Sequence, residues 1–290
     1  MTAPGGERPG YRAAAAARRR AAARRRRAFI AAALLLLLLA APALAVLLLT
    51  GNGGEKPPPP PAIVARLTIP EGFTLRQIAA RAGEIGLFSA DDFLAAAAAG
   101  DYQVPILPEG QRTNLEGLLF PKTYDLPEGM QPRELVQKLL DQFALETAGL
   151  DLGRAEKLGI TPYQAVIVAS LIEREVVVDE ERPLVAAVIY NRLKANMPLQ
   201  IDATVQYALP QWKENLTYED LKVDSPYNTY RNRGLPPAPI CNPGLKSLEA
   251  ALEPASVDYL YYVATGEGGR HFFTADYQEF LRAKQQANKK

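Results

Sequence analysis

The sequence has very little of two residue types on which much enzyme chemistry depends, since its 290 residues include one cysteine and one histidine. A single cysteine, Cys241, excludes an intramolecular disulfide. One Cys and one His are also too few for the usual zinc site, and a histidine-dependent catalytic triad would have to use His271. We expect no metal site and no cofactor in this protein.

The formal net charge of +1 hides a strong asymmetry along the chain. Residues 1–27 carry nine arginines and one acidic residue, Glu7, which leaves 24 basic and 31 acidic side chains for the rest. That remainder has a net charge of −7, so the basic charge is confined to one end. The main body of the protein is therefore not expected to bind nucleic acid.

An uncharged run of 23 residues, Ala28–Thr50, follows the arginines directly. About 20 apolar residues cross a bilayer, and arginines stay on the cytoplasmic side. The pattern predicts a single-pass helix over 28–50 in the inner (cytoplasmic) membrane, with residues 1–27 in the cytoplasm. A cleaved signal peptide with its cleavage site at Ala43–Ala45 is the alternative, although the apolar run continues through Val46–Leu49. Both interpretations place the remaining chain outside the cytoplasmic membrane.

A linker over residues 51–62, with five consecutive prolines, precedes the first predicted elements. Ile63–Ile69 alternates like a strand. Thr74 begins a capping box for a helix through about Ile85, and Ser89 caps a second helix that ends near Gly100. This strand–helix–helix unit is either a packing or spacer module or a glycan-binding module.

Further helices are predicted in the rest of the chain. Leu115–Gly129 is expected to be a rigid connection, and a helix follows from Pro132 to about Glu146. The helix that begins at Thr161-Pro162 is apolar on all sides, which predicts burial. Another helix is expected from about Glu180 to Ala195. Beyond it we predict loops over 200–207 and 227–244, strands at Tyr259–Thr265 and Arg270–Thr274, and a C-terminal helix.

The buried helix ends with two glutamates. Glu173 shares a helical face with Val166, Ala169, Ser170 and Val177, whereas Glu175 lies about 200° around the helix, so the two should not face one cleft unless the helix ends between them. Apolar surroundings and the helix C-terminus would raise the pKa of an inward-facing Glu173, as a general acid requires. The alternative is a solvated Glu173 paired with Arg174 or Arg192.

Residues from about 63 to 285 resemble the endolytic murein transglycosylase family, also described as YceG-like, and the order and spacing of the matching stretches are highly specific. They are Ile69–Gly72, Leu115–Gly117, Phe120–Pro121, Thr123–Tyr124, Ala169–Glu175, Val188–Leu193, Met197–Gln200 with Asp202 and Thr204, Tyr227–Tyr230, Gly234–Pro237, Ile240, Asn242–Gly244, Leu260–Val263 and His271–Phe272.

The resemblance implies an α+β protein with a single-pass membrane anchor, a LysM-like module over 63–120 and a lysozyme-like, transglycosylase-type catalytic domain over 121–290. It makes the first glutamate of the E-x-E pair, Glu173, the catalytic acid/base, although the family commonly has lysine where this chain has Arg174. The implied substrate is the peptidoglycan glycan strand, cut between N-acetylmuramic acid and N-acetylglucosamine. The expected partners are penicillin-binding proteins or other peptidoglycan synthases.

A lytic transglycosylase needs only one carboxyl group, because the 6-hydroxyl of the muramic acid replaces water as the nucleophile. Gln200, Asp202 and Thr204 alternate as on an extended segment and would point the same way, though Asp202 could instead cap a turn. The Tyr227–Tyr230 segment could bind sugar or anchor a buried loop, and His271 could be structural or lie at the cleft edge. The candidate substrate-binding residues are Gln200, Asp202, Thr204, Tyr227, Asn228, Thr229, Tyr230, His271 and Glu175.

Three other functions compete with this prediction. The first is an anchored murein-binding scaffold with an inactive site. The second is a hydrolytic muramidase, which would use Asp202 or Glu175 as a second carboxylate. The third is aminodeoxychorismate lyase, an older label of the family, which needs pyridoxal phosphate. The sequence lacks a phosphate cradle for that cofactor, so we discount it.

Overall fold

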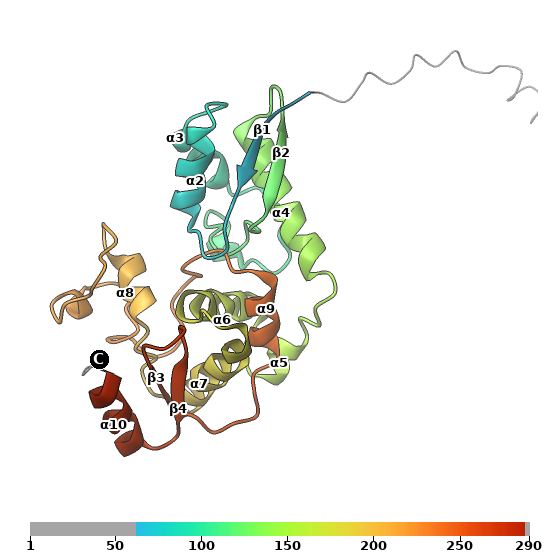
Figure 1. The fold of residues 1–290 in the computed structure, drawn as a ribbon. Coiled ribbons are helices and arrows are strands. Elements are labelled where there is room, and N and C mark those ends of the chain that lie inside the picture. Colours follow the sequence, from blue (N-terminus) through green and yellow to red (C-terminus); the bar gives the residue numbers. More distant parts are fainter. Residues whose placement is uncertain (1–61, 288–290) are drawn as a thin grey trace, which may run out of the picture. The chain divides into compact units, whose positions relative to one another are not determined.

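The computed structural model describes residues 62–287, which fall within one compact unit, 61–290 (Figure 1). The arginine-rich tail, the apolar run Ala28–Thr50 and all but the last residue of the linker lie outside the described residues. Within 62–287, no helix is both long enough and apolar enough to span a membrane. The described residues form a mixed α+β fold with two small sheets.

The N-terminal part is built on the expected strand and two helices, β1 (Ile63–Thr68), α2 (Leu75–Glu84) and α3 (Ala90–Ala97). Both predicted capping boxes are present, with Thr74 and Ser89 as the capping residues. A short 3-10 turn η1 (Glu109–Gln111) and the helix α4 (Pro132–Thr147) follow, and α4 packs against α3.

The connection expected over Leu115–Gly129 contains a strand, β2 (Thr123–Pro127). It pairs antiparallel with β1, in register from Thr68 with Thr123 to Ile63 with Pro127, with an irregularity after Ile63. This short strand was not predicted, because its pairing partner lies more than fifty residues earlier in the chain. The pairing also crosses residue 120, where we expected one module to end and the next to begin.

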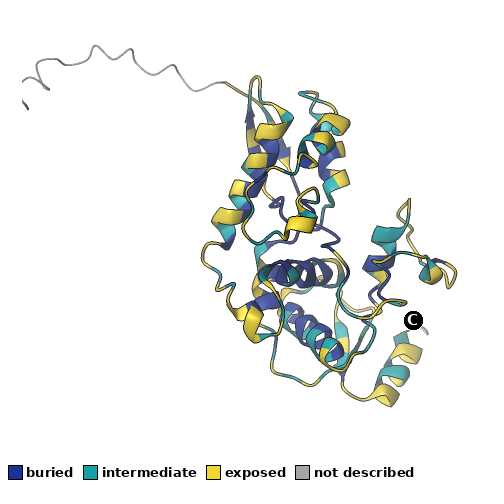
Figure 2. Ribbon diagram, turned by 180° about the vertical axis from the view of Figure 1, so that it is seen from behind, coloured by how far each residue is buried: buried dark blue, intermediate teal, exposed yellow. Residues whose placement is uncertain are grey.

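The helix α6 (Pro162–Glu175) lies at the centre of the second half, and Figure 2 shows its dark, buried ribbon. Every residue from Ala165 to Ile172 is buried, because the helix is covered by α7 (Arg182–Lys194), α9 (Leu245–Leu252) and other neighbours. A short helix α5 (Arg154–Lys157) precedes it, and a 3-10 turn η2 (Asp179–Glu181) leads into α7. The predicted buried helix is confirmed.

The segment from Gln200 to Thr204, which we expected to be extended, is not. Gln200 has a positive φ of 53°, and the helix α8 (Asp202–Ala208) begins two residues later. A 3-10 turn η3 (Asp220–Lys222) follows. The helix α9, which begins directly after Gly244, was also not predicted.

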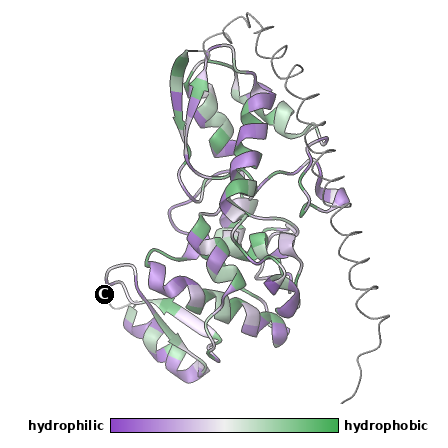
Figure 3. Ribbon diagram, turned by 90° about the vertical axis from the view of Figure 1, so that its right-hand side faces the viewer, coloured by the Kyte–Doolittle hydropathy of each residue, from purple (hydrophilic) through white to green (hydrophobic). Residues whose placement is uncertain are grey.

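The chain ends in a hairpin and a helix, as expected. Strands β3 (Tyr261–Ala264) and β4 (His271–Thr274) pair antiparallel. The last helix, α10 (Tyr277–Ala287), carries both polar and apolar residues and packs on the hairpin (Figure 3).

Candidate active site

The carboxyl group of Glu173 lies at the N-terminus of α9. Its Oε2 atom accepts hydrogen bonds from the backbone N–H of Gly244 (3.0 Å) and the Ser247 hydroxyl (2.8 Å). It also lies 3.4 Å from Nη1 of Arg182, and both charged side chains are only 8% exposed. The arrangement places an anion where a helix presents free N–H groups, which is favourable.

These contacts correct the apolar surroundings that we expected for Glu173. The side chain is largely buried, but three polar donors surround it, and its charged partner is Arg182 rather than Arg174 or Arg192. The face prediction fits the structure better. The Ser170 hydroxyl, one turn earlier, accepts from the N–H of Ile240 (3.1 Å), so this face of α6 packs on residues 240–247. Val177 lies beyond the end of α6 and is 76% exposed.

Glu175 faces a different group of residues. The hydroxyl of Tyr262, from β3, donates to Oε2 of Glu175 over 2.8 Å, and the side chain is partly buried. Burial raises the pKa of Glu175, and the carboxylate of Asp202 acts in the same direction, whereas the Tyr262 hydroxyl, His271 and the Ala203 N–H lower it. The rise in pKa through burial that we expected for Glu173 is therefore found for Glu175.

Asp202 and Tyr230 lie together next to Glu175. The Tyr230 hydroxyl donates a short hydrogen bond to Asp202, the first residue of α8, and the charge of Glu175 acts on Tyr230. This contact joins two predicted binding segments that are 28 residues apart. Tyr230 is partly buried and Asp202 is exposed, so both are accessible at the surface.

His271 begins β4 and is held by a buried carboxylate. Its Nδ1 lies 2.8 Å from Oε2 of Glu181, and its backbone N–H also donates to that carboxyl group. The imidazole meets the ring of Tyr262 edge-on, with centroids 5.4 Å apart. His271 thus packs against Tyr262, which in turn donates to Glu175.

Other predicted residues are buried or turned to internal partners. Thr204 and Thr229 are 0% and 2% exposed and bond each other through their hydroxyls (2.9 Å). Asn228 is fully buried, and its amide group donates to the carbonyls of Leu221 and Val223. The loop-anchor alternative thus describes Asn228, and the two threonines join α8 to the same loop.

Tyr227 and Gln200 complete the predicted set. The ring of Tyr227 packs on Tyr207 (centroids 4.8 Å apart), and its charge interactions are with Glu116 rather than with the residues around Glu175. Gln200 is exposed, and its backbone N–H donates to the carbonyl of Thr229.

Sequence reasoning did not assign functional roles to Tyr262, Arg182 or Arg192. Arg192 is 8% exposed and donates to the carbonyls of Leu199 (2.7 Å) and Leu260 (2.7 Å), which precede α8 and β3. It therefore holds the two segments that border Glu175. A signal was available, because Arg192 and Tyr262 lie inside matched stretches, Val188–Leu193 and Leu260–Val263.

The turn between β1 and α2 reaches the end of α6. The Arg174 guanidinium donates to the carbonyl of Gly72 (3.4 Å), and the charge of Glu173 acts on Glu71. Burial raises the pKa of Glu71, and the neighbouring Glu173 adds to that effect. A Cβ atom at Gly244 would lie 1.8 Å from Oε1 of Glu71, so a larger residue there would require the Glu71 side chain to move.

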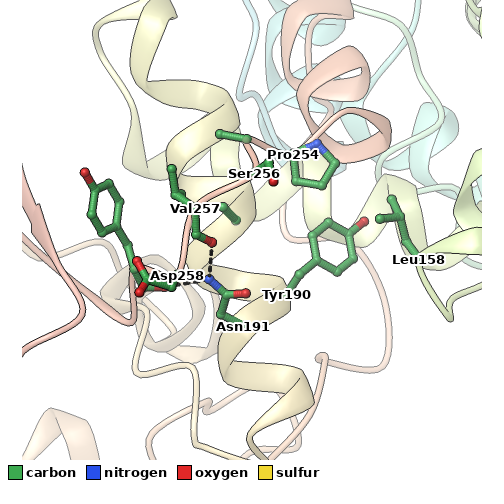
Figure 4. A pocket seen from close by; sticks show the side chains of 10 residues that line it. Leu158, Tyr190, Asn191, Pro254, Ser256, Val257 and Asp258 are labelled. Atoms are coloured by element: carbon green, nitrogen blue, oxygen red, sulfur yellow. Dashed lines mark hydrogen bonds between the residues drawn. The ribbon is translucent and has the colours of Figure 1, made fainter.

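A cavity of about 670 Å³ lies away from these carboxyl groups, between α7 and the segment that links α9 to β3 (Figure 4). The Asn191 amide, in its wall, donates to the carbonyls of Val257 and Tyr259, and the Tyr190 hydroxyl donates to that of Ala251. These polar groups are already paired, and Glu173 and Glu175 do not line the cavity. We therefore place the candidate active site at the end of α6 instead.

Comparison with known proteins gives the family. The sequence profile of the YceG-like family matches residues 43–286. The chain belongs to the YceG-like family. The solved structure of a YceG-like protein from Listeria monocytogenes has a TM-score of 0.68 and 34% identity, over 76% of each chain.

Two curated relatives carry the name endolytic murein transglycosylase. The Bacillus subtilis (strain 168) protein is 41% identical over 171 residues, which cover 59% of this chain and 47% of the relative. The Streptococcus pneumoniae (strain R6) protein is 33% identical over 243 residues, which cover 76% of this chain and 44% of the relative. The chain therefore spans about half the length of the curated relatives it matches.

Proposed function

We propose that this member of the YceG-like family is an endolytic murein lytic transglycosylase that uses a single carboxyl group, Glu175, as its acid and base. The names of the Bacillus and Streptococcus relatives support this reaction class. The observation that carries the choice of residue is the position of the partly exposed Glu175 carboxyl group, which accepts from Tyr262 and lies beside the accessible Asp202 and Tyr230; burial also raises its pKa.

The reaction needs two successive proton transfers through one carboxyl group. Protonated Glu175 donates its proton to the glycosidic oxygen as the bond between that oxygen and C1 of N-acetylmuramic acid breaks. The resulting carboxylate takes the proton from the 6-hydroxyl of the same sugar while O6 bonds to C1. A 1,6-anhydro end forms, and the carboxyl group is protonated again. Burial favours the protonated starting state, and the Tyr262 hydroxyl and Ala203 N–H stabilise the carboxylate intermediate.

Glu173 has a different role in this proposal. Its bonds to Gly244, Ser247 and Arg182 attach the N-terminus of α9 to the end of α6. We assign it to positioning, in place of the catalytic role expected from the resemblance. The positions of Tyr230 and Asp202 beside Glu175 support sugar contacts for both, and His271 positions Tyr262.

The finer organisation is also proposed. The strand–helix–helix order from residue 63 supports a LysM-like module, on which β2 and α4 also pack, and the buried α6 with a carboxyl group at its end supports a lysozyme-like catalytic domain built around that helix. The arginine cluster and the run Ala28–Thr50 support an inner-membrane anchor with the N-terminus in the cytoplasm. An enzyme tethered in this way would cut glycan strands close to the synthases, including penicillin-binding proteins, that make them.

A matched pair of variants tests the assignment. Glu175→Gln keeps the shape but removes the proton, and we expect it to reduce release of anhydromuropeptides from sacculi by about 10²–10⁴-fold. Glu173→Gln should retain measurable activity. Mass spectrometry of the products and circular dichroism of both variants are the measurements. If Glu175→Gln is active and Glu173→Gln is folded but inactive, Glu173 is the catalytic acid instead.

A hydrolytic muramidase is the second candidate, and the closeness of Asp202 to Glu175 favours it. In that reaction Asp202 would act as the second carboxylate. Its products carry reducing ends that are heavier than the anhydro ends by one water molecule. The same mass spectra therefore separate the two reactions, and sacculi left uncut by the wild-type protein would indicate a binding scaffold.

A further inference from the structure

The chain leaves the compact part of the fold between α8 and Tyr227, and this excursion, residues 209–226, carries two exposed aromatic rings. Trp212 is 68% exposed and Tyr218 is 89% exposed. Trp212 is the only tryptophan of the sequence. Within residues 62–287, neither ring belongs to an aromatic pair. Tryptophan and tyrosine are enriched at interaction surfaces, because each joins a large apolar ring to a polar group.

A polar scaffold holds the backbone beside each ring. The carboxyl group of Asp220 is 9% exposed and accepts from the Lys213 ammonium (2.5 Å) and from the N–H and hydroxyl of Thr217 (2.9 and 2.7 Å). The Gln206 side chain, from α8, both donates to and accepts from the backbone of Lys213. Lys213 follows Trp212, and Thr217 precedes Tyr218, so the backbone next to both rings is fixed although the rings are uncovered.

Both ends of the excursion are attached to the segments next to Glu175. Gln206 lies four residues after Asp202, about 6 Å along α8. At the other end, Asn228 lies two residues before Tyr230, and its amide group donates to the carbonyls of Leu221 and Val223 within the excursion. Because Asp202 and Tyr230 bond each other beside Glu175, a ligand that reaches from Glu175 along α8 would meet the excursion next.

We propose that Trp212 and Tyr218 form an outer carbohydrate-binding platform, on which the glycan strand lies several sugar rings from the bond that is cut. This inference rests on the proposed function and extends it to longer substrates. Aromatic rings offer large, rigid contact areas to the apolar faces of sugars at a low entropy cost. The excursion has charges of both signs, including Lys213, Glu214 and Glu219. That mixture fits a sugar chain better than a polyanion or an anionic membrane.

The single tryptophan gives a direct test of the platform. Full-length Glu175→Gln protein, in which turnover is blocked, is titrated with peptide-free murein glycan strands. We expect a saturable shift of the tryptophan emission to shorter wavelength, because stacking removes Trp212 from water. Co-sedimentation with sacculi measures binding independently of the emission. Unchanged emission, whether or not the protein sediments with sacculi, would overturn the platform.

Kinetics of otherwise wild-type protein provide the second test. Trp212→Ala should raise KM for long strands about ten-fold while kcat changes by less than about two-fold, since the ring acts only in binding. Trp212→Phe should recover most of the loss. Leu145→Ala, which removes an equally exposed (68%) apolar side chain on α4, should leave KM unchanged. A wild-type KM in Trp212→Ala would overturn the platform, whereas an emission shift without anhydro products would contradict the proposed reaction instead.

Discussion

Two carboxyl groups, two residues apart at the end of one helix, have different neighbours. Glu173 is bonded to an arginine, a hydroxyl and a helix N-terminus, and these contacts stabilise the negative charge. Glu175 has a tyrosine hydroxyl beside it, and burial together with Asp202 disfavours its charge. The comparison teaches that position on α6 is not enough to assign the acid, because residues from other elements determine the contacts and the burial of each carboxyl group.

The largest expected effect on stability concerns the pair of Glu173 and Arg182. Arg182→Ala leaves the buried Glu173 carboxylate without its cation, so we expect a loss of about 3–5 kcal/mol in the free energy of unfolding. Adding Glu173→Gln to this variant should restore part of the loss, because a neutral amide is less costly to bury. Urea unfolding of the two single variants and the double variant measures both effects.

The matched control for this prediction is Arg66→Ala. Arg66 pairs with Asp125 over 2.8 Å, but the two side chains are 74% and 51% exposed. Solvent screens such a pair, and we expect its removal to cost at most about 1 kcal/mol. Equal losses in Arg182→Ala and Arg66→Ala would contradict the structural role that separates Glu173 from Glu175.

Glu116 is a third buried carboxyl group to compare with Glu173 and Glu175. Hydrogen bonds hold it in place, and no residue in the described part of the chain forms an ion pair with it. Glu116 is 2% exposed and accepts from the Leu75 N–H (2.9 Å), the Asn242 amide (3.0 Å) and the Tyr207 hydroxyl (3.1 Å). Burial raises its pKa from 4.5 to about 7. Its bonds connect α2 with α8 and with the segment that leads to α9.

The raised pKa of Glu116 predicts a pH dependence of stability. Between about pH 4.5 and pH 7 the folded protein keeps a proton that the unfolded chain has lost, so the free energy of unfolding falls as the pH rises through this window. Over the whole window the fall is about 3 kcal/mol. We expect Glu116→Gln to remove the contribution of Glu116 and so reduce this slope, while keeping the acceptor for Leu75. Unfolding measured from pH 5 to pH 8 tests it, with the exposed Glu109→Gln as the control that retains the slope.

The sequence predicted local features of the fold well. The capping boxes at Thr74 and Ser89 and the apolar run of α6 are properties of neighbouring residues, and the structure confirms all of them. The missed elements depend on distant partners. The helix α9 begins after a glycine, and its first donors are satisfied by Glu173, which lies 71 residues earlier than Gly244.

In the candidate site, too, the local features were predicted and the long-range contacts were not. A turn of 100° per residue correctly separated the faces of Glu173 and Glu175. The different neighbours of the two glutamates could not be predicted from the helix sequence. Tyr262 lies 87 residues beyond Glu175, and Arg182 reaches Glu173 from another helix. Likewise, the pattern at Gln200–Thr204 suggested an extended segment because nothing nearby indicates that Thr229 stabilises a helix there.

The smallest expected effect concerns the hydroxyl group that distinguishes the surroundings of Glu175. Tyr262→Phe removes a donor that stabilises the Glu175 carboxylate and lowers its pKa, so the pKa of Glu175 should rise further. The protonated acid then persists to higher pH, and the basic limb of the profile of kcat/KM against pH should move upward. The rate at neutral pH should fall about ten-fold, because the carboxylate intermediate loses a hydrogen bond. Tyr261→Phe, on the same strand, should leave the limb in place. A limb that does not move in Tyr262→Phe would mean that a group other than Glu175 donates the proton.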